Sequence, residues 1–243
     1  MNINTEINTF KKFIKNMDIP KLNPPHHFDE EWRFTKLNFL NDISSKITIQ
    51  PNIFNQKLID DHSSIEGLDI LNMNDAINQY PSIMKQYFSN IYKHEDNYFC
   101  TENLNFITDG IVIIVKNNYT ISKPLEIIFS NIIESKIFPR IFIYCSKNSK
   151  LTFIEKYNSN NYNLYTNIIT EIYIDENASL EYIKFQNESE SYKALNDVIL
   201  QLSNVGINIT PENISISIVN LNKLNKHIGI LTENKLKVDD LQT

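Results

Sequence analysis

The sequence predicts a mainly β protein that is preceded by a small helical N-terminal region. Residues 1 to about 97 place apolar side chains at intervals of three and four, which is the period of an amphipathic helix. From about Cys100 onward, short apolar runs follow one another at the period of a strand, with Asn-rich turns between them. We therefore expect residues 1–97 to form a helical region and residues 98–243 to form a β region.

The first helix is expected near the N-terminus. Its apolar face would consist of Ile3, Ile7, Phe10, Ile14 and Met17. We expect it to end near Ile19-Pro20, because proline cannot continue a helix. The following segment, Lys21 to Phe28, contains two adjacent prolines and is expected to be a linker.

A second helical block is expected at Asn72 to Asn90. Asp75 is the expected N-cap, because a short acidic side chain can accept a hydrogen bond from a free backbone N–H at a helix start. Pro81 fits the first turn of a new helix, Ser82 to Phe88, where no backbone N–H is needed.

Eight short apolar runs predict the strands of the β region. They are Gly110 to Val115, Leu125 to Phe129, Arg140 to Cys145, Leu151 to Glu155, Ile168 to Ile174, Leu180 to Phe185, Ile214 to Val219 and Ile228 to Leu231. Asn adopts the left-handed turn conformation that glycine usually supplies, so 35 Asn can serve these turns in a chain with only 4 Gly. Tyr192 to Asn204 fits a helix as well as a strand, and its context favours a strand.

Charge and composition exclude several classes of protein. The 243 residues carry a net charge of −6 and the basic residues form no stripe, so nucleic acid is not an expected partner. The N-terminus has no export signal, and the longest aliphatic run, Ile111 to Val115, is far below the roughly 20 residues that span a membrane. Two cysteines make no disulfide framework. We expect a cytoplasmic protein, or one of an organelle matrix, with no membrane partner.

The sequence contains no recognisable catalytic constellation. A glycine-rich phosphate loop, a nucleophile elbow and paired metal ligands are all missing from it. We therefore expect the chain not to be an enzyme. We assign no catalytic residue and no metal ligand, and leave any cofactor-binding residue unassigned.

Histidines and cysteines have simple structural roles in this interpretation. His26 and His27 are expected in a solvated linker, because neighbouring side chains point to different sides of a helix or strand. Cys145 ends an alternating apolar run and is expected in the core. Cys100 is a lone thiol at the junction of the two regions.

Two sets of acidic residues leave alternatives open. Asp29 to Thr35 is expected to start a helix that Trp32 and Phe34 dock to the core, and the alternative is an acid site beside an aromatic platform. Glu155 and Glu171 lie in predicted strands and are expected to face water. The alternative is a pair of carboxylates across adjacent turns of sheet.

An ordered series of short motifs resembles the SufB/SufD family of iron–sulfur cluster assembly proteins. The series is Glu31-Trp32-Arg33-Phe34-Thr35, Leu104-Asn105, Thr108-Asp109-Gly110, Pro124-Leu125-Glu126, Pro139-Arg140, Glu155-Lys156-Tyr157, Asn167, Thr170-Glu171, Asn177-Ala178-Ser179-Leu180-Glu181-Tyr182 and Gln186-Asn187-Glu188. The helical lead-in with the EWRFT pattern, together with Asp75 to Phe88, is more similar to SufD than to SufB.

The resemblance implies a right-handed parallel β-helix for residues 98–243 and the role of a non-catalytic scaffold subunit. It implies a SufB-like scaffold subunit and a SufC-like ATPase as partners, with the iron–sulfur cluster handled by the assembled complex. With Cys100 and Cys145 as its only thiols, the isolated chain is expected to bind no cluster.

The chain is expected to lack the family's C-terminal half. Gly229 to Asp240 resembles a stretch in the middle of the family's β-helix, and the sequence stops at Thr243. The domain that contacts SufC, and the Cys and His positions implicated in cluster assembly, would then be absent. Neither partner therefore follows from the residues present, and no functional residue of the family has a counterpart here.

Two other functions are compatible with the predicted fold. The chain could be an interaction module that has no role in cluster chemistry. A carbohydrate-processing β-helix enzyme would need clustered basic residues and acidic metal ligands, and the chain offers only two arginines, Arg33 and Arg140.

Overall fold

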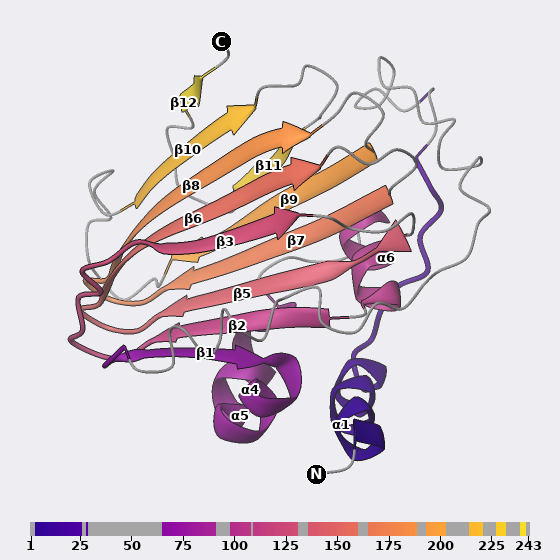
Figure 1. Ribbon diagram of the computed structural model, residues 1–243. Helices are drawn as coiled ribbons and strands as arrows, with labels where there is room; N and C mark the ends of the chain where they lie inside the picture. Colours follow the sequence, from indigo (N-terminus) through magenta and orange to yellow (C-terminus); the bar gives the residue numbers. More distant parts are fainter. Residues whose placement is uncertain are drawn as a thin grey trace.

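The computed structural model describes residues 3–25, 28, 65–90, 98–107, 109–130, 136–159, 165–188, 193–202, 214–220, 227–231 and 239–241. Within these residues the chain forms two β-sheets and a layer of short helices (Figure 1). The helices are α1 (Ile3–Lys15), α4 (Met73–Gln79), α5 (Pro81–Tyr87) and α6 (Tyr98–Phe106).

The strands divide between the two sheets. Sheet A consists of β1 (Leu68–Asn72), β2 (Asp109–Val115), β4 (Lys136–Ile137), β5 (Pro139–Cys145), β7 (Tyr165–Ile174), β9 (Lys193–Leu202) and β11 (His227–Leu231). Sheet B consists of β3 (Leu125–Ser130), β6 (Lys150–Ser159), β8 (Ser179–Glu188), β10 (Ile214–Asn220) and β12 (Asp239–Leu241). From β5 onward, successive strands alternate between the sheets.

Nearly all strand pairings are parallel. Sheet A has the order β1-β2-β5-β7-β9-β11, with β4 beside β7, and sheet B has the order β3-β6-β8-β10-β12. Among the described strands, only β1 is antiparallel to its neighbour, β2. The fold is therefore mainly β, as predicted, and all eight predicted strands are confirmed. Tyr192 to Asn204, which fitted either element, contains the strand β9.

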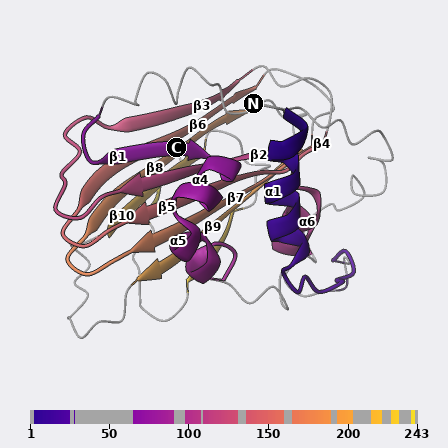
Figure 2. The ribbon, with the colours of Figure 1, turned by 90° about the horizontal axis from the view of Figure 1, so that it is seen from below.

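Sheet A faces two hydrophobic cores, because alternate residues of a strand point to opposite faces. In β2, Ile111, Ile113 and Val115 lie in the core between the sheets, whereas Val112 and Ile114 lie in the core beneath the helices. All five side chains are buried. Sheet A is thus a central layer, with sheet B on one side and the helices on the other (Figures 1 and 2).

The predicted N-terminal helix is confirmed as α1, although it ends at Lys15 rather than near Ile19. From Phe10 onward, its apolar side chains pack in the core beneath the helices. The Phe10 ring lies edge-on to the Phe88 ring, with centroids 6.5 Å apart, and the Phe10 backbone N–H donates to Asn74 Oδ1 at 3.1 Å. None of the described helices is long and apolar enough to cross a membrane.

The predicted block Asn72 to Asn90 is confirmed as the helices α4 and α5, but its predicted cap is wrong. Asn72 rather than Asp75 caps α4, because Asn72 Oδ1 accepts the Asp75 backbone N–H at 2.9 Å. Asn72 Nδ2 also donates to the Asp75 carboxylate at 2.8 Å. Both residue types can cap a helix, and the end of β1 at Asn72 decides which one does. Pro81 opens α5, as predicted.

The change from helical to strand period does not occur at Cys100. The helix α6 extends to Phe106, and β1 forms within the stretch that was expected to be helical. α6 buries polar residues such as Thr101 and Asn103 as well as apolar ones, so its sequence carries no clear helical period. The division between residues 97 and 98 stays a prediction.

Three tight turns stack where strands of sheet A lead into sheet B. Asn118, Asn148 and Asn177 occupy the left-handed region, with φ of 65, 56 and 55°. Asn148 Nδ2 donates to Asn118 Oδ1 at 2.8 Å across 30 residues, and Asn177 Nδ2 donates to Asn148 Oδ1 at 3.2 Å across 29 residues. This confirms the predicted use of asparagine in the turns and shows that it also links one turn to the next.

The packing of β2 beneath α4 leads to a first prediction. A Cβ atom at Gly110 would collide with the Met73 side chain and lie 2.7 Å from the Arg140 carbonyl oxygen of β5. Because a backbone oxygen in the middle of a sheet cannot move aside easily, we expect Gly110→Ala to lower the free energy of unfolding by about 2 kcal/mol. Urea unfolding followed by circular dichroism measures this change.

The control for that measurement is Lys150→Ala, which changes an exposed side chain. We expect it to alter the free energy of unfolding by less than about 0.5 kcal/mol. Equal stability of Gly110→Ala and the unchanged protein would contradict the close approach of β2 to β5 and α4.

Candidate functional site

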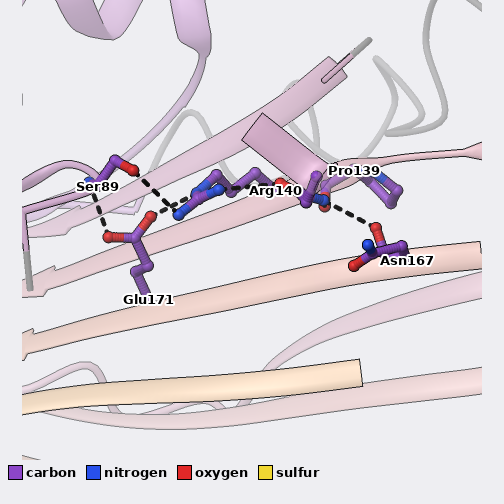
Figure 3. Close-up of polar contacts among 6 residues, drawn as sticks. Ser89, Pro139, Arg140, Asn167 and Glu171 are labelled. Atoms are coloured by element: carbon purple, nitrogen blue, oxygen red, sulfur yellow. Dashed lines mark hydrogen bonds and ion pairs between the residues drawn. The ribbon is translucent and has the colours of Figure 1, made fainter. Parts of the chain in front are cut away.

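A buried polar cluster joins the helices to the outer face of sheet A (Figure 3). At its centre, Arg140 Nε in β5 donates to Glu171 Oε1 in the neighbouring strand β7, and both side chains are only 1% exposed. Arg140 Nη1 donates to Asn103 Oδ1 at 2.9 Å and Nη2 to Ser89 Oγ at 3.3 Å. The Ser89 backbone N–H donates to Glu171 Oε2 at 2.8 Å. One ion pair thus contacts α6 and the residues that follow α5.

Two asparagines extend this cluster along α6. Asn103 Nδ2 donates to the carbonyl oxygens of Pro139 at 3.0 Å and Asn167 at 2.8 Å. In return, Asn167 Nδ2 donates to the Phe99 carbonyl oxygen at 2.8 Å and to Glu102 Oε2 at 3.0 Å. These reciprocal bonds fix the position of α6 along β5 and β7.

A second polar cluster lies between the two sheets. The Glu155 carboxylate in β6 accepts hydrogen bonds from the Tyr182 hydroxyl and, at 3.2 Å, from the Thr170 hydroxyl. Lys184 Nζ lies 3.6 Å from Glu155 Oε1. All four side chains are fully buried. Burial, and then the charge of Glu155, raises the pKa of Tyr182 well above its ordinary value, so this hydroxyl remains a proton donor.

The expectation that Glu155 and Glu171 face water is wrong. Both are buried, and they lie in different cores: Glu155 between the sheets and Glu171 beneath the helices. They therefore form no pair of carboxylates, and each faces a cation instead, Lys184 or Arg140. Strand period alone could not reveal this, because it assigns a residue to a face without showing what covers that face.

The two cysteines lie in different cores. Cys145 belongs to the core between the sheets, which confirms its predicted place, and Cys100 belongs to the core beneath the helices. Burial raises the pKa of the Cys145 thiol to about 12, which keeps the free thiol protonated at neutral pH. Two thiols on opposite faces of sheet A cannot ligate one iron–sulfur cluster together. Within the described residues, no group of three or more Cys, His, Asp or Glu side chains could hold a metal ion.

Some predicted candidates lie outside the described residues. These are His26, His27 and the segment Asp29 to Thr35 with Arg33. Their roles as linker and helix start stay predictions.

The sequence did contain a signal for these clusters, although reasoning from single residues missed it. Six of the clustered residues belong to the ordered series of motifs: Arg140, Glu155, Asn167, Thr170, Glu171 and Tyr182. Arg140 is also one of only two arginines in the chain. The structure brings together motif residues that are well separated in sequence.

Two family regions match the chain in succession. Residues 34–127 match the SufBD protein N-terminal region, and residues 128–216 match the SufBD core domain of SUF-system iron–sulfur cluster assembly. The chain belongs to the SufB/SufD family. Ser89 and Asn103 lie in the first matched region, whereas Arg140 and Glu171 lie in the second. The outer polar cluster therefore joins the two family regions.

Known members of the SufB/SufD family resemble parts of the chain. An iron–sulfur cluster assembly SufBD family protein of Synechocystis is 25% identical over 200 residues, which are 68% of this chain and 44% of that protein. A SufBD family protein of Pyrococcus horikoshii is 31% identical over 130 residues, 51% of this chain and 29% of that protein. A chloroplastic SufBD family protein of Arabidopsis thaliana is 25% identical over 124 residues, which are 50% of this chain and 22% of that protein. The chain thus spans less than half the length of each relative.

The buried ion pair leads to a second prediction. Arg140→Met or Glu171→Leu alone leaves an uncompensated buried charge, and we expect each to lower the free energy of unfolding by about 3 kcal/mol or more. The free energy of unfolding of the double variant should fall by clearly less than the sum of the two single losses, because the double variant removes both charges. Urea unfolding of the four proteins measures the coupling. Additive losses would show that the two side chains do not act as a pair.

The matched control for this cycle is Lys147→Met. Lys147 Nζ lies 2.8 Å from Glu176 Oε2, but its side chain is 50% exposed. We expect the free energy of unfolding of that variant to fall by less than about 1 kcal/mol, because water screens an exposed ion pair.

The buried thiol leads to a third prediction. In a Cys100→Ala variant, Cys145 is the only thiol, and a pKa of about 12 leaves roughly one thiolate in 10⁴ at pH 8. We expect iodoacetamide to label Cys145 only as urea unfolds the protein, with mass spectrometry as the readout. Labelling of the folded variant at the rate of a free cysteine would contradict the burial of this side chain.

Proposed function

We propose that the chain is a SufD-like, non-catalytic scaffold subunit of the SUF iron–sulfur cluster assembly machinery. The observation that carries this proposal is the succession of the SufBD N-terminal and core regions along residues 34–216. The SufD-like part of the proposal is supported by the segment Asp75 to Phe88, which is more similar to SufD than to SufB. That segment forms most of α4 and α5, which help to cover sheet A.

We further propose that sheets A and B are two walls of a right-handed parallel β-helix. Parallel pairing and strands that alternate between the sheets are what such a coil requires. The stacked asparagine turns recur after 30 and 29 residues, which fits one coil of about that length. Stacked coils make a stiff, extended body, which suits a scaffold on which other subunits assemble.

A non-catalytic role is supported by how the buried charges are used. Arg140 faces Glu171 and Lys184 faces Glu155, so each charge is balanced within the protein and holds two structural elements together. We assign the chain no catalytic residue. Because its two thiols lie in different cores, we assign the iron–sulfur cluster to the assembled complex, as its cargo.

The partners in this proposal are a SufB-like subunit and a SufC-like ATPase in the cytoplasm. The test is to coexpress the tagged chain with both proteins from its own genome and to purify them without oxygen. We expect one complex on gel filtration, with iron and visible cluster absorption after anaerobic reconstitution. The chain purified alone should keep neither after desalting.

The tag without the chain is the control for the copurification. Separate elution of the chain from both partners would contradict the scaffold role. One cluster bound firmly by the chain alone would contradict the assignment of the cluster to the complex.

A further inference from the structure

Positive charge gathers at the N-terminal helix of a chain that is acidic overall. Between residues 11 and 21 there are four lysines and a single acidic residue, Asp18, in a protein of net charge −6. The lysines are Lys11, Lys12, Lys15 and Lys21, and we refer to them as the lysine face. All four side chains are exposed.

The lysine face is held in place by the opposite side of the same helix. The rings of Phe10 and Phe13 lie 6.5 and 6.0 Å from the Phe88 ring, and Phe10 is buried in the core beneath the helices. Figures 1 and 2 show α1 lying beside α4 and α5, on the side of sheet A that the helices cover. The charges therefore project from a docked helix, which reduces the entropy that a partner must remove on binding.

Helix stability explains only part of this charge. Lys12 and Lys15 lie in the last turn of α1, where they favour the negative end of the helix dipole. Lys11 lies four residues before Lys15, a spacing at which like charges destabilise a helix, and Lys21 lies beyond the helix end. The ion pairs found within the described part of the chain involve other residues. The repulsion between the lysines of this face therefore does not stabilise α1, and the stability of the helix does not account for their grouping.

We propose that the lysine face binds an acidic segment of a partner protein. The negative charges of such a segment would offset the repulsion between the lysines. At physiological salt, charges more than about 8 Å apart are largely screened from each other. A short segment at the lysine face would therefore be attracted by the lysines and would hardly be repelled by the acidic remainder of the chain. Lysine, a mobile point charge, suits carboxylates that are not held in one geometry. The inference does not depend on the proposed role in iron–sulfur cluster assembly.

Two other polyanions fit the lysine face less well. Binding at a membrane surface uses the apolar side of an amphipathic helix, and in α1 that side already packs against Phe88. A long nucleic acid would extend over the rest of a protein of net charge −6, and the lysine face contains no arginine for bidentate phosphate contacts. A short acidic peptide avoids both difficulties.

The test uses the full chain and a fluorescein-labelled oligoglutamate peptide, with fluorescence anisotropy at low and physiological salt. We expect binding that weakens as salt rises and that weakens roughly tenfold in Lys11→Glu/Lys15→Glu. Lys11→Arg/Lys15→Arg keeps the charge and should keep the affinity. The matched control, Lys123→Glu/Lys150→Glu, makes the same change of net charge at two exposed lysines of the β region and should bind like the unchanged chain.

Three outcomes would overturn the proposal. These are no binding by the unchanged chain at low salt, an equal loss in the control variant, or tighter binding to phosphatidylserine vesicles or duplex DNA than to oligoglutamate. Circular dichroism of each variant separates a loss of charge from a loss of folding. If Lys11→Glu/Lys15→Glu is unfolded, failure of the folded arginine variant to bind would overturn the proposal equally.

Discussion

Burial of sheet A on both faces is the constraint on which the rest of the structure depends. A strand offers its side chains only two directions, and in β2 Ile113 meets the core shared with sheet B while Ile114 meets the core beneath the helices. Polar side chains at the centre of this sheet consequently have to find partners within the protein. The helical layer and the two polar clusters are both consequences of this arrangement.

The two polar clusters solve the same problem on opposite sides of sheet A. An isolated buried charge is unfavourable, and in each cluster a carboxylate faces a cation while hydroxyl, amide or backbone groups supply further hydrogen bonds. The cluster between the sheets links β6, β7 and β8, whereas the outer cluster links β5 and β7 to the helical layer. The outer cluster adds side-chain contacts between the two matched SufBD regions, which the pairing of β2 with β5 also joins.

The same constraint places the remaining surface features. With the inner face of sheet A occupied by sheet B, the described helices all gather on its outer face (Figure 2), and the side chains of Lys11, Lys12 and Lys15 in α1 are exposed. At the edge where strands pass from sheet A to sheet B, the turns are short enough to stack, and their asparagines bond from one turn to the next. Stacking of this kind keeps neighbouring strands in register.

The sequence by itself determined the eight strands, the asparagine turns, the place of Cys145 and the family, because period, turn chemistry and motif order are local properties of the chain. Only the tertiary structure decided that α6 is a helix, that Asn72 caps α4 and that Glu155 and Glu171 are buried. Arg140 lies 31 residues from Glu171, a separation bridged by one passage through sheet B. Which charged side chains pair depends on the number of residues between successive strands of sheet A and on the element that covers each face of the sheet. The sequence of a single strand contains neither piece of information.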